Sequence, residues 1–271
     1  MRRRHALAVL IILSCGALTA AAQTCTLSFT GMSFGTYNGA VLNGTATGTV
    51  RCAGSWDIPL DAGTGVGATE TTRYMTGPNG AELAYQVFQD AARTINWGNT
   101  TTTEVSGTGN ATVTAYGQIA AGQYVVPGTY TDTLHTATTS ITVTATVLKD
   151  CGVSATNLVF GNYTGAVNNT TSTVTVTCTN TTTYTVGLSA GLATGATVTT
   201  RKMQNGAYLL SYALYSNATH TTNWGNTAAT NWVSGTGTGI AQALTVYGQI
   251  AAGLYVTPGS YTDTITATVT Y

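Results

Sequence analysis

The feature that most constrains the fold of this chain is an internal duplication marked by cysteines. Cys25 and Cys52 lie 27 residues apart. Cys151 and Cys178 have the same spacing, and this second pair follows the first by 126 residues. The 271 residues therefore divide into two equivalent units of ordinary domain size. An even number of cysteines at repeated spacing is typical of disulfides in an exported protein, and pairing within each repeat is favoured over pairing between repeats.

Metal binding is the competing interpretation of the cysteines. Zinc sites draw on closely spaced cysteines and histidines. The chain has no CxxC motif, and beyond its first residues its histidines are His135 and His220. The sequence therefore predicts no metal site and no cofactor.

The duplication extends to turns and strands far from the cysteines. The segment YGQIAAG at 116–122 returns unchanged at 247–253, and PGTYTDT at 127–133 returns as PGSYTDT at 258–264. Two copies of about 120 residues indicate two equivalent domains rather than a solenoid, which needs more repeats.

Composition favours strands over helices in both repeats. Charged residues make up only 7% of the chain, glycines number 32, and Thr, Val and Tyr recur in short alternating runs such as Thr173–Thr177. Helical periodicity is missing almost everywhere. About six or seven strands and one disulfide per repeat predict an all-β fold of two tandem immunoglobulin-like sandwiches.

Residues 1–22 are predicted to be a signal peptide. Three arginines at 2–4 precede the apolar stretch Ala6–Leu13, which is too short to span a bilayer, and small residues at 20–22 form a cleavage site. A lipid anchor at Cys15 is the less favoured alternative. Removal leaves six Lys/Arg against nine Asp/Glu, a net charge near −3 (6 − 9), so no basic patch for nucleic acid is expected and no membrane span.

The two repeats end differently. In the second repeat, the chain stops after a strand with four alternating residues on one face: Ile265, Ala267, Val269 and Tyr271. The first repeat passes the same point and continues into a further alternating run: Ile141, Val143, Ala145 and Val147. We therefore expect a first domain at 23–140, a strand-forming linker at 141–150 that completes it, and a second domain at 151–271.

The second sandwich is accordingly expected to lack its final strand and to present an acceptor edge at Ile265, Ala267, Val269 and Tyr271. An exposed apolar edge of this kind recruits the strand of another chain. The mature chain has only Gln23 and Thr24 before its first cysteine, so it has nothing to donate in return. The alternative is that 141–147 is the first strand of the second domain, and both roles are compatible.

The repeated motifs resemble the spore coat protein U domain, the subunit family of archaic chaperone–usher pili. The resemblance spans the mature chain twice and rests on the order of five motifs: Cys151–Ala155, Phe160–Tyr163, Trp224–Gly225, Tyr247–Ile250 and Pro258–Thr264. The first copy departs from it at Thr26–Phe29 and at its extended end. The family implies an incomplete, pilin-type sandwich whose groove is filled by a periplasmic chaperone and then by the N-terminal extension of the next subunit. Ser140–Lys149 matches that extension but is internal.

The resemblance implies a two-domain tip subunit, an adhesin with its first domain outermost. The expected partners are a periplasmic pilus chaperone, an usher, a neighbouring pilin subunit and an unknown surface or receptor. The protein is expected to cross the periplasm and to end in a cell-surface pilus. Two other interpretations are a secreted spore-coat or extracellular matrix structural protein and, third, a carbohydrate-binding module.

Single residues give no support for an enzyme. Asp132 and Asp263 are equivalent in the two repeats and adjoin a turn, so a structural role is favoured over catalysis. Aromatic residues found in both repeats are favoured as core. Trp56 is the exception, because Thr182 stands at the matching place counted from the cysteine. We expect Trp56 to be either a contact residue of the first domain or a buried one.

Overall fold

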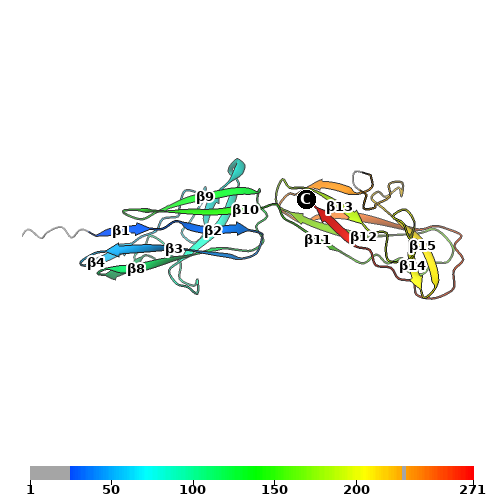
Figure 1. Ribbon diagram of the computed structural model, residues 1–271, viewed down its shortest axis with the longest axis horizontal. Helices are drawn as coiled ribbons and strands as arrows, with labels where there is room; N and C mark the ends of the chain where they lie inside the picture. The colour runs from blue at the N-terminus through cyan, green and yellow to red at the C-terminus, as the bar shows by residue number, and fades with distance from the viewer. Residues whose placement is uncertain (1–24, 228–229) are drawn as a thin grey trace, which may run out of the picture.

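The computed structural model describes residues 25–227 and 230–271, which form two all-β lobes joined end to end (Figure 1). Domain one contains strands β1 to β10 and domain two contains β11 to β18. The described residues include one helical segment, a single 3-10 turn at Pro78–Gly80. The predicted all-β class, with one disulfide in each domain, is confirmed. The predicted signal peptide at 1–22 lies outside the described residues.

Domain one is built mainly from one curled eight-stranded sheet with the order β1-β3-β8-β6-β5-β9-β10-β2, accompanied by the pair β4-β7. The strands are β1 (Thr26–Phe29), β2 (Met32–Tyr37), β3 (Leu42–Arg51), β4 (Ser55–Ile58), β5 (Arg73–Thr76), β6 (Glu82–Phe88), β7 (Val105–Thr108), β8 (Ala111–Ile119), β9 (Gly128–His135) and β10 (Ser140–Val147). Gly44 and Gly117 leave room for the ring of Phe34, which lets β2 fold over the centre of the sheet.

Domain two has a five-stranded sheet with the order β11-β12-β17-β15-β14 and a three-stranded sheet with the order β16-β13-β18. The strands are β11 (Cys151–Ala155), β12 (Asn168–Cys178), β13 (Thr183–Leu188), β14 (Arg201–Asn205), β15 (Tyr208–Tyr215), β16 (Val233–Thr236), β17 (Gln242–Ile250) and β18 (Ala267–Thr270). The apolar residues of β12, β13 and β17 face inward at every second position, as their alternating sequence predicts.

Both domains share a rigid skeleton around a buried arginine. In domain two the side chain of Arg201 is fully buried and donates to the backbone oxygens of Ser189, Val198 and Trp224. Arg73 makes the equivalent bonds in domain one, including one to Trp97. Burial disfavours the charged guanidinium, so the pKa of Arg201 falls to about 10. The repeated Arg and Trp residues are therefore core residues that join turns and strands.

The segment expected to complete domain one forms β10, which lies between β9 and β2. It runs antiparallel to β9 over eight residue pairs and parallel to β2, where Val143 faces Met32. Its four inward side chains are at most 3% exposed: Ile141, Val143, Ala145 and Val147. Among the described strands, β10 pairs with β9 and β2 of domain one and with no strand of domain two.

Candidate strand-acceptor groove

The duplication makes domain one a matched reference for domain two, and the two differ where β10 lies. In domain two, residues 158–163 correspond to β2 and residues 259–266 correspond to β9. The structure assigns neither segment to a strand, apart from one isolated bridge between Thr262 and Gln204. In the part of the chain that the structure describes, no hydrogen bond joins the two segments. Domain two therefore has a gap at the position that β10 fills in domain one.

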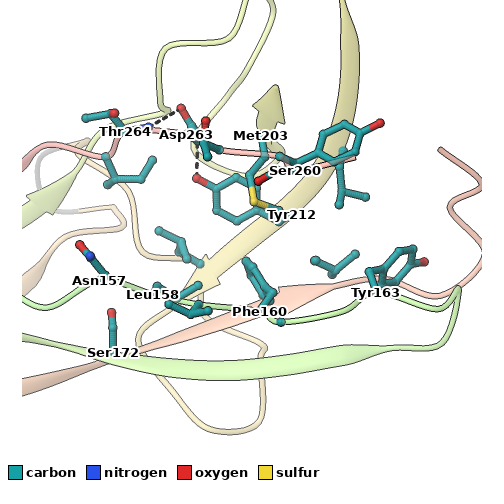
Figure 2. A pocket seen from close by; sticks show the side chains of 18 of the residues that line it. Asn157, Leu158, Phe160, Tyr163, Ser172, Met203, Tyr212, Ser260, Asp263 and Thr264 are labelled. Atoms are coloured by element: carbon teal, nitrogen blue, oxygen red, sulfur yellow. Dashed lines mark hydrogen bonds between the residues drawn. The ribbon is translucent and has the colours of Figure 1, made fainter. Parts of the chain in front are cut away.

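The gap is a groove of about 1280 Å³. One wall consists of residues 155–163 and the other of residues 256–267, while Tyr212, Leu214 and Val246 lie at its floor. Figure 2 shows Leu158, Phe160 and Tyr163 on one side of the groove and Met203 and Tyr212 on the other. The rings of Phe160 and Tyr212 meet edge to face, with their centroids 5.7 Å apart. An apolar floor between two backbone walls is the environment that accepts an extended strand with alternating apolar side chains.

Core residues along the groove are less covered than their counterparts in domain one. Tyr130 and Leu134 of β9 are fully buried, whereas the equivalent Tyr261 and Ile265 are only partly buried. The same holds for β2, where Tyr37 is 1% exposed and the equivalent Tyr163 is partly exposed. Since the amino acids are the same or similar, the difference in burial comes from the missing strand.

A tyrosine–aspartate pair holds the 256–267 wall in place without strand pairing. Asp263 accepts hydrogen bonds from the Tyr212 hydroxyl at 2.8 Å and from the Leu192 N–H at 3.0 Å. Burial is the main cause that raises the pKa of Tyr212 above its usual value, and the hydrogen bond to Asp263 and its charge raise it further. Tyr85 and Asp132 form the same pair in domain one at 2.6 Å. Both aspartates thus make structural contacts, as their repeated position suggested.

Only part of the segment predicted as an acceptor edge lies at the groove. Of the four residues predicted for it, Ile265 and Ala267 line the groove, whereas Val269 and Tyr271 do not. Val269 belongs to β18, which pairs antiparallel with β13. The physical reason is that domain one turns back at 136–139 and enters β10. The corresponding part of domain two continues without this turn into β18, which pairs with β13. The groove edge is therefore 256–267 rather than 265–271.

The expectation that Trp56 has no counterpart is wrong. Trp56 in β4 pairs with Gly107, and Tyr184 in β13 pairs with the equivalent Gly235. The segment from the cysteine to this aromatic residue is two residues longer in domain two, which hid the match with Tyr184 behind Thr182. The Trp56 indole is half-buried and donates to a backbone oxygen at 2.8 Å, so the structure shows a structural contact for it.

The wall formed by Leu158, Phe160 and Tyr163 was not identified as part of a site from the sequence. A signal for it was present in the motif Phe160–Tyr163, which carries part of the family resemblance and repeats the segment Phe34–Tyr37 of domain one. The alternation of Leu158 and Phe160 would have indicated a second apolar edge. The sequence did not indicate that residues 155–163 and the C-terminal wall lie on opposite sides of one groove.

Other kinds of site find little support in the described residues. Among residues 25–227 and 230–271, no group of three or more His, Cys, Asp and Glu side chains is placed to hold a metal ion. His135 and Asp61 form an isolated pair, 2.9 Å apart and largely exposed. None of the helical structure in these residues is long and apolar enough to cross a membrane.

Comparisons with known proteins agree with the geometry. Residues 12–137 and 136–268 each match the Spore Coat Protein U domain. The chain belongs to this family. It is a structural, non-enzymatic family, and this chain carries the domain in tandem.

Two relatives illustrate how far the similarity extends. Over 87 residues the chain is 38% identical to Protein U of Myxococcus xanthus, a match that covers 31% of this chain and about half of that protein (48%). A chain in the crystal structure of the CsuC–CsuE chaperone–tip adhesion subunit complex, from archaic chaperone-usher Csu pili of Acinetobacter baumannii, superposes with a TM-score of 0.56. That match has 16% identity and covers 92% of this chain and 100% of the other, so it establishes a shared fold.

Proposed function

We propose that this protein is a subunit of an archaic chaperone–usher pilus, and that domain two joins it to the pilus by binding a strand of the next subunit. The observation that carries the proposal is the groove in domain two at the position that β10 fills in domain one. Strand β10 of domain one is therefore an example, within this chain, of a strand that fits such a groove. The shared fold with a chaperone–tip subunit complex supports the same assignment.

Burial of side chains would make such a joint long-lived. Each fully buried Val or Ile side chain contributes about 1.5–3 kcal/mol, and β10 buries three of them and an alanine in domain one. Backbone hydrogen bonds to both walls would add to this gain, as they do for the eight pairs between β10 and β9. The incoming strand needs the same alternation of apolar side chains.

The proposal assigns the chain to the pilus tip. Domain one is closed by its own β10, so the described part of the chain has one open groove and places it in domain two. Because the donor-like strand β10 is already paired inside domain one, we place the subunit at the distal end, with domain one outermost against a surface or receptor. The partners are then a periplasmic chaperone, an usher and one neighbouring subunit, and the protein crosses the periplasm before reaching the cell surface.

A peptide with the sequence of Ser140–Lys149 tests the groove directly. We expect the purified full chain to bind this peptide and to gain thermal stability, because the peptide reproduces β10. A matched control peptide carries Asp in place of Val143 and Ala145, and it should not bind. Equal binding of the two peptides would contradict the groove as the strand-binding site. Pili that assemble without this chain in them, in cells with a pilus gene cluster, would contradict its role as a pilus subunit.

A coat or matrix protein is the second candidate, favoured by the identity with Protein U. Such a protein self-associates outside the cell without a dedicated chaperone. Immunogold labelling of intact cells and spores separates the two functions. Label confined to filament ends supports the pilus, whereas label spread over a coat or matrix supports the alternative.

A further inference from the structure

The joint between the two domains of this chain is built from backbone contacts. The N–H of Asn180 in domain two donates to the backbone oxygen of Tyr124 in domain one at 2.9 Å. Gly239 lies beside the same oxygen, since a Cβ atom there would come within 2.9 Å of it. The ring of Tyr124 covers the turn at Gly39, which has φ of +85°. One loop of domain one, residues 120–127, thus contacts two loops of domain two.

Both loops that domain two brings to this joint are longer than their counterparts in domain one. Two extra residues follow Cys178, and the connection between β16 and β17 runs over 237–241 where β7 and β8 are joined by Gly109 and Asn110 alone. The lengthened loops carry the two contact residues, Asn180 and Gly239. The linker is held to the first of them, because Thr179 N–H donates to the backbone oxygen of Asp150 at 2.9 Å. Domain one has the short loops at the end that points away from domain two.

The far end of domain two repeats the surface that domain one uses in the joint. The N–H of Gly253 donates to the oxygen of Gly165 at 2.9 Å, just as Gly122 donates to Gly39. The hydroxyl of Tyr163 donates to the backbone oxygen of Ala251 at 2.6 Å and so holds the loop in the same way that Tyr37 does in domain one. This docking end, defined by Gly165 and residues 251–258, is therefore already formed.

The tyrosine that the two docking ends share differs in its exposure. Tyr255 stands at the place of Tyr124 but is 95% exposed. No atom lies within 4 Å of the position where a Cβ of Gly165 would be, whereas the equivalent Gly39 has the Tyr124 ring at 3.7 Å. The docking end of domain two thus has the same main-chain hydrogen bonds as the joint in domain one, but its tyrosine is exposed.

We propose that this docking end binds the next subunit through the loop that follows that subunit's first disulfide cysteine, in the geometry of the joint between Tyr124 and Asn180. The backbone oxygen of Tyr255 accepts an N–H from that loop, and the Tyr255 ring covers Gly165. The partner is a sandwich domain with loops as long as those of domain two. The inference rests on the proposed function, because β10 leads to Cys151 through only Leu148–Asp150, and a strand in the groove would deliver the next domain to this end.

Site-specific photocross-linking tests this contact in the full chain. The photoreactive residue p-benzoylphenylalanine replaces Tyr255, and pili isolated from the native cells are irradiated and analysed by mass spectrometry. We expect cross-links to the neighbouring subunit, within a few residues after its first disulfide cysteine. The same replacement at Tyr124 is the positive control and should cross-link within the chain to residues 179–182 or 237–241. Val66, 82% exposed in domain one, is the matched negative control.

A third position separates this inference from the proposed function. Val159 lines the groove and is 69% exposed, so the photoreactive residue there should capture the donated strand. Cross-links from Val159 combined with none from Tyr255, or with products in other parts of the neighbour, overturn the docking contact and leave the strand-binding function standing. Loss of cross-links at both positions overturns both.

Discussion

The same buried hydrogen bond occurs twice in this chain in two different environments. Tyr85 donates to Asp132 inside a closed sandwich, and Tyr212 donates to Asp263 beside an open groove. The tyrosines are 1% and 6% exposed, whereas Asp132 is buried at 3% and Asp263 is only partly buried. An aspartate near solvent can replace a lost donor with water, but a buried aspartate cannot.

We therefore predict unequal effects of removing the two hydroxyls. Tyr85→Phe should lower the free energy of unfolding by about 1–3 kcal/mol, the cost of leaving a buried acceptor unsatisfied, and Tyr212→Phe should cost less. Urea unfolding of the full chain, followed by the fluorescence of its four tryptophans, measures both. Equal losses would mean that water reaches both aspartates or neither. With peptide bound in the groove, the cost of Tyr212→Phe should rise toward that of Tyr85→Phe.

At the scale of elements, β10 decides whether a domain is closed. Its side chain Val143 is fully buried, whereas the adjacent Thr142 points to solvent. Burying a carboxylate at Val143 without a partner would cost several kcal/mol. We predict that Val143→Asp expels β10 and leaves domain one with an open groove, and that Thr142→Asp does not.

The readout for this substitution is binding of the Ser140–Lys149 peptide. The wild-type chain should bind one peptide, in domain two, and the Val143→Asp chain should bind two. Isothermal titration calorimetry gives the stoichiometry, and circular dichroism checks that the β content remains. A stoichiometry of one for a folded Val143→Asp chain would contradict the equivalence of the two grooves.

Much of this architecture was predictable because strands and disulfides leave local signals. Alternation such as that of Thr173–Thr177 marks a strand in any context, and the equal cysteine spacing indicated one disulfide per domain. Pairing partners were not predictable in the same way. The pairing of β18 with β13 depends on where the chain goes when β10 is missing, and the match of Trp56 with Tyr184 depends on a loop length that sequence offsets conceal.

At the scale of the whole molecule, one chain combines a closed domain with an open one of nearly the same sequence pattern. The domains differ in which strand follows the β9 segment, β10 in domain one and β18 in domain two, rather than in the composition of the core. Stability should accordingly be unevenly distributed, since local opening is easiest where apolar contacts and backbone pairing are fewest. Residues 157–163 and 259–266, which lie within the two walls of the groove, meet both conditions.

Hydrogen exchange of the full chain tests this distribution. We predict fast exchange of backbone amides at 157–163 and 259–266, apart from Thr262, whose N–H donates to Gln204, and slower exchange at the equivalent 32–37 and 128–135, where β2 and β9 pair with the two sides of β10. Adding the Ser140–Lys149 peptide should slow exchange in the two groove walls and leave domain one unchanged, which serves as the internal control. Slow exchange in the walls without peptide would mean that domain two is already closed, and the groove would then have no strand to receive.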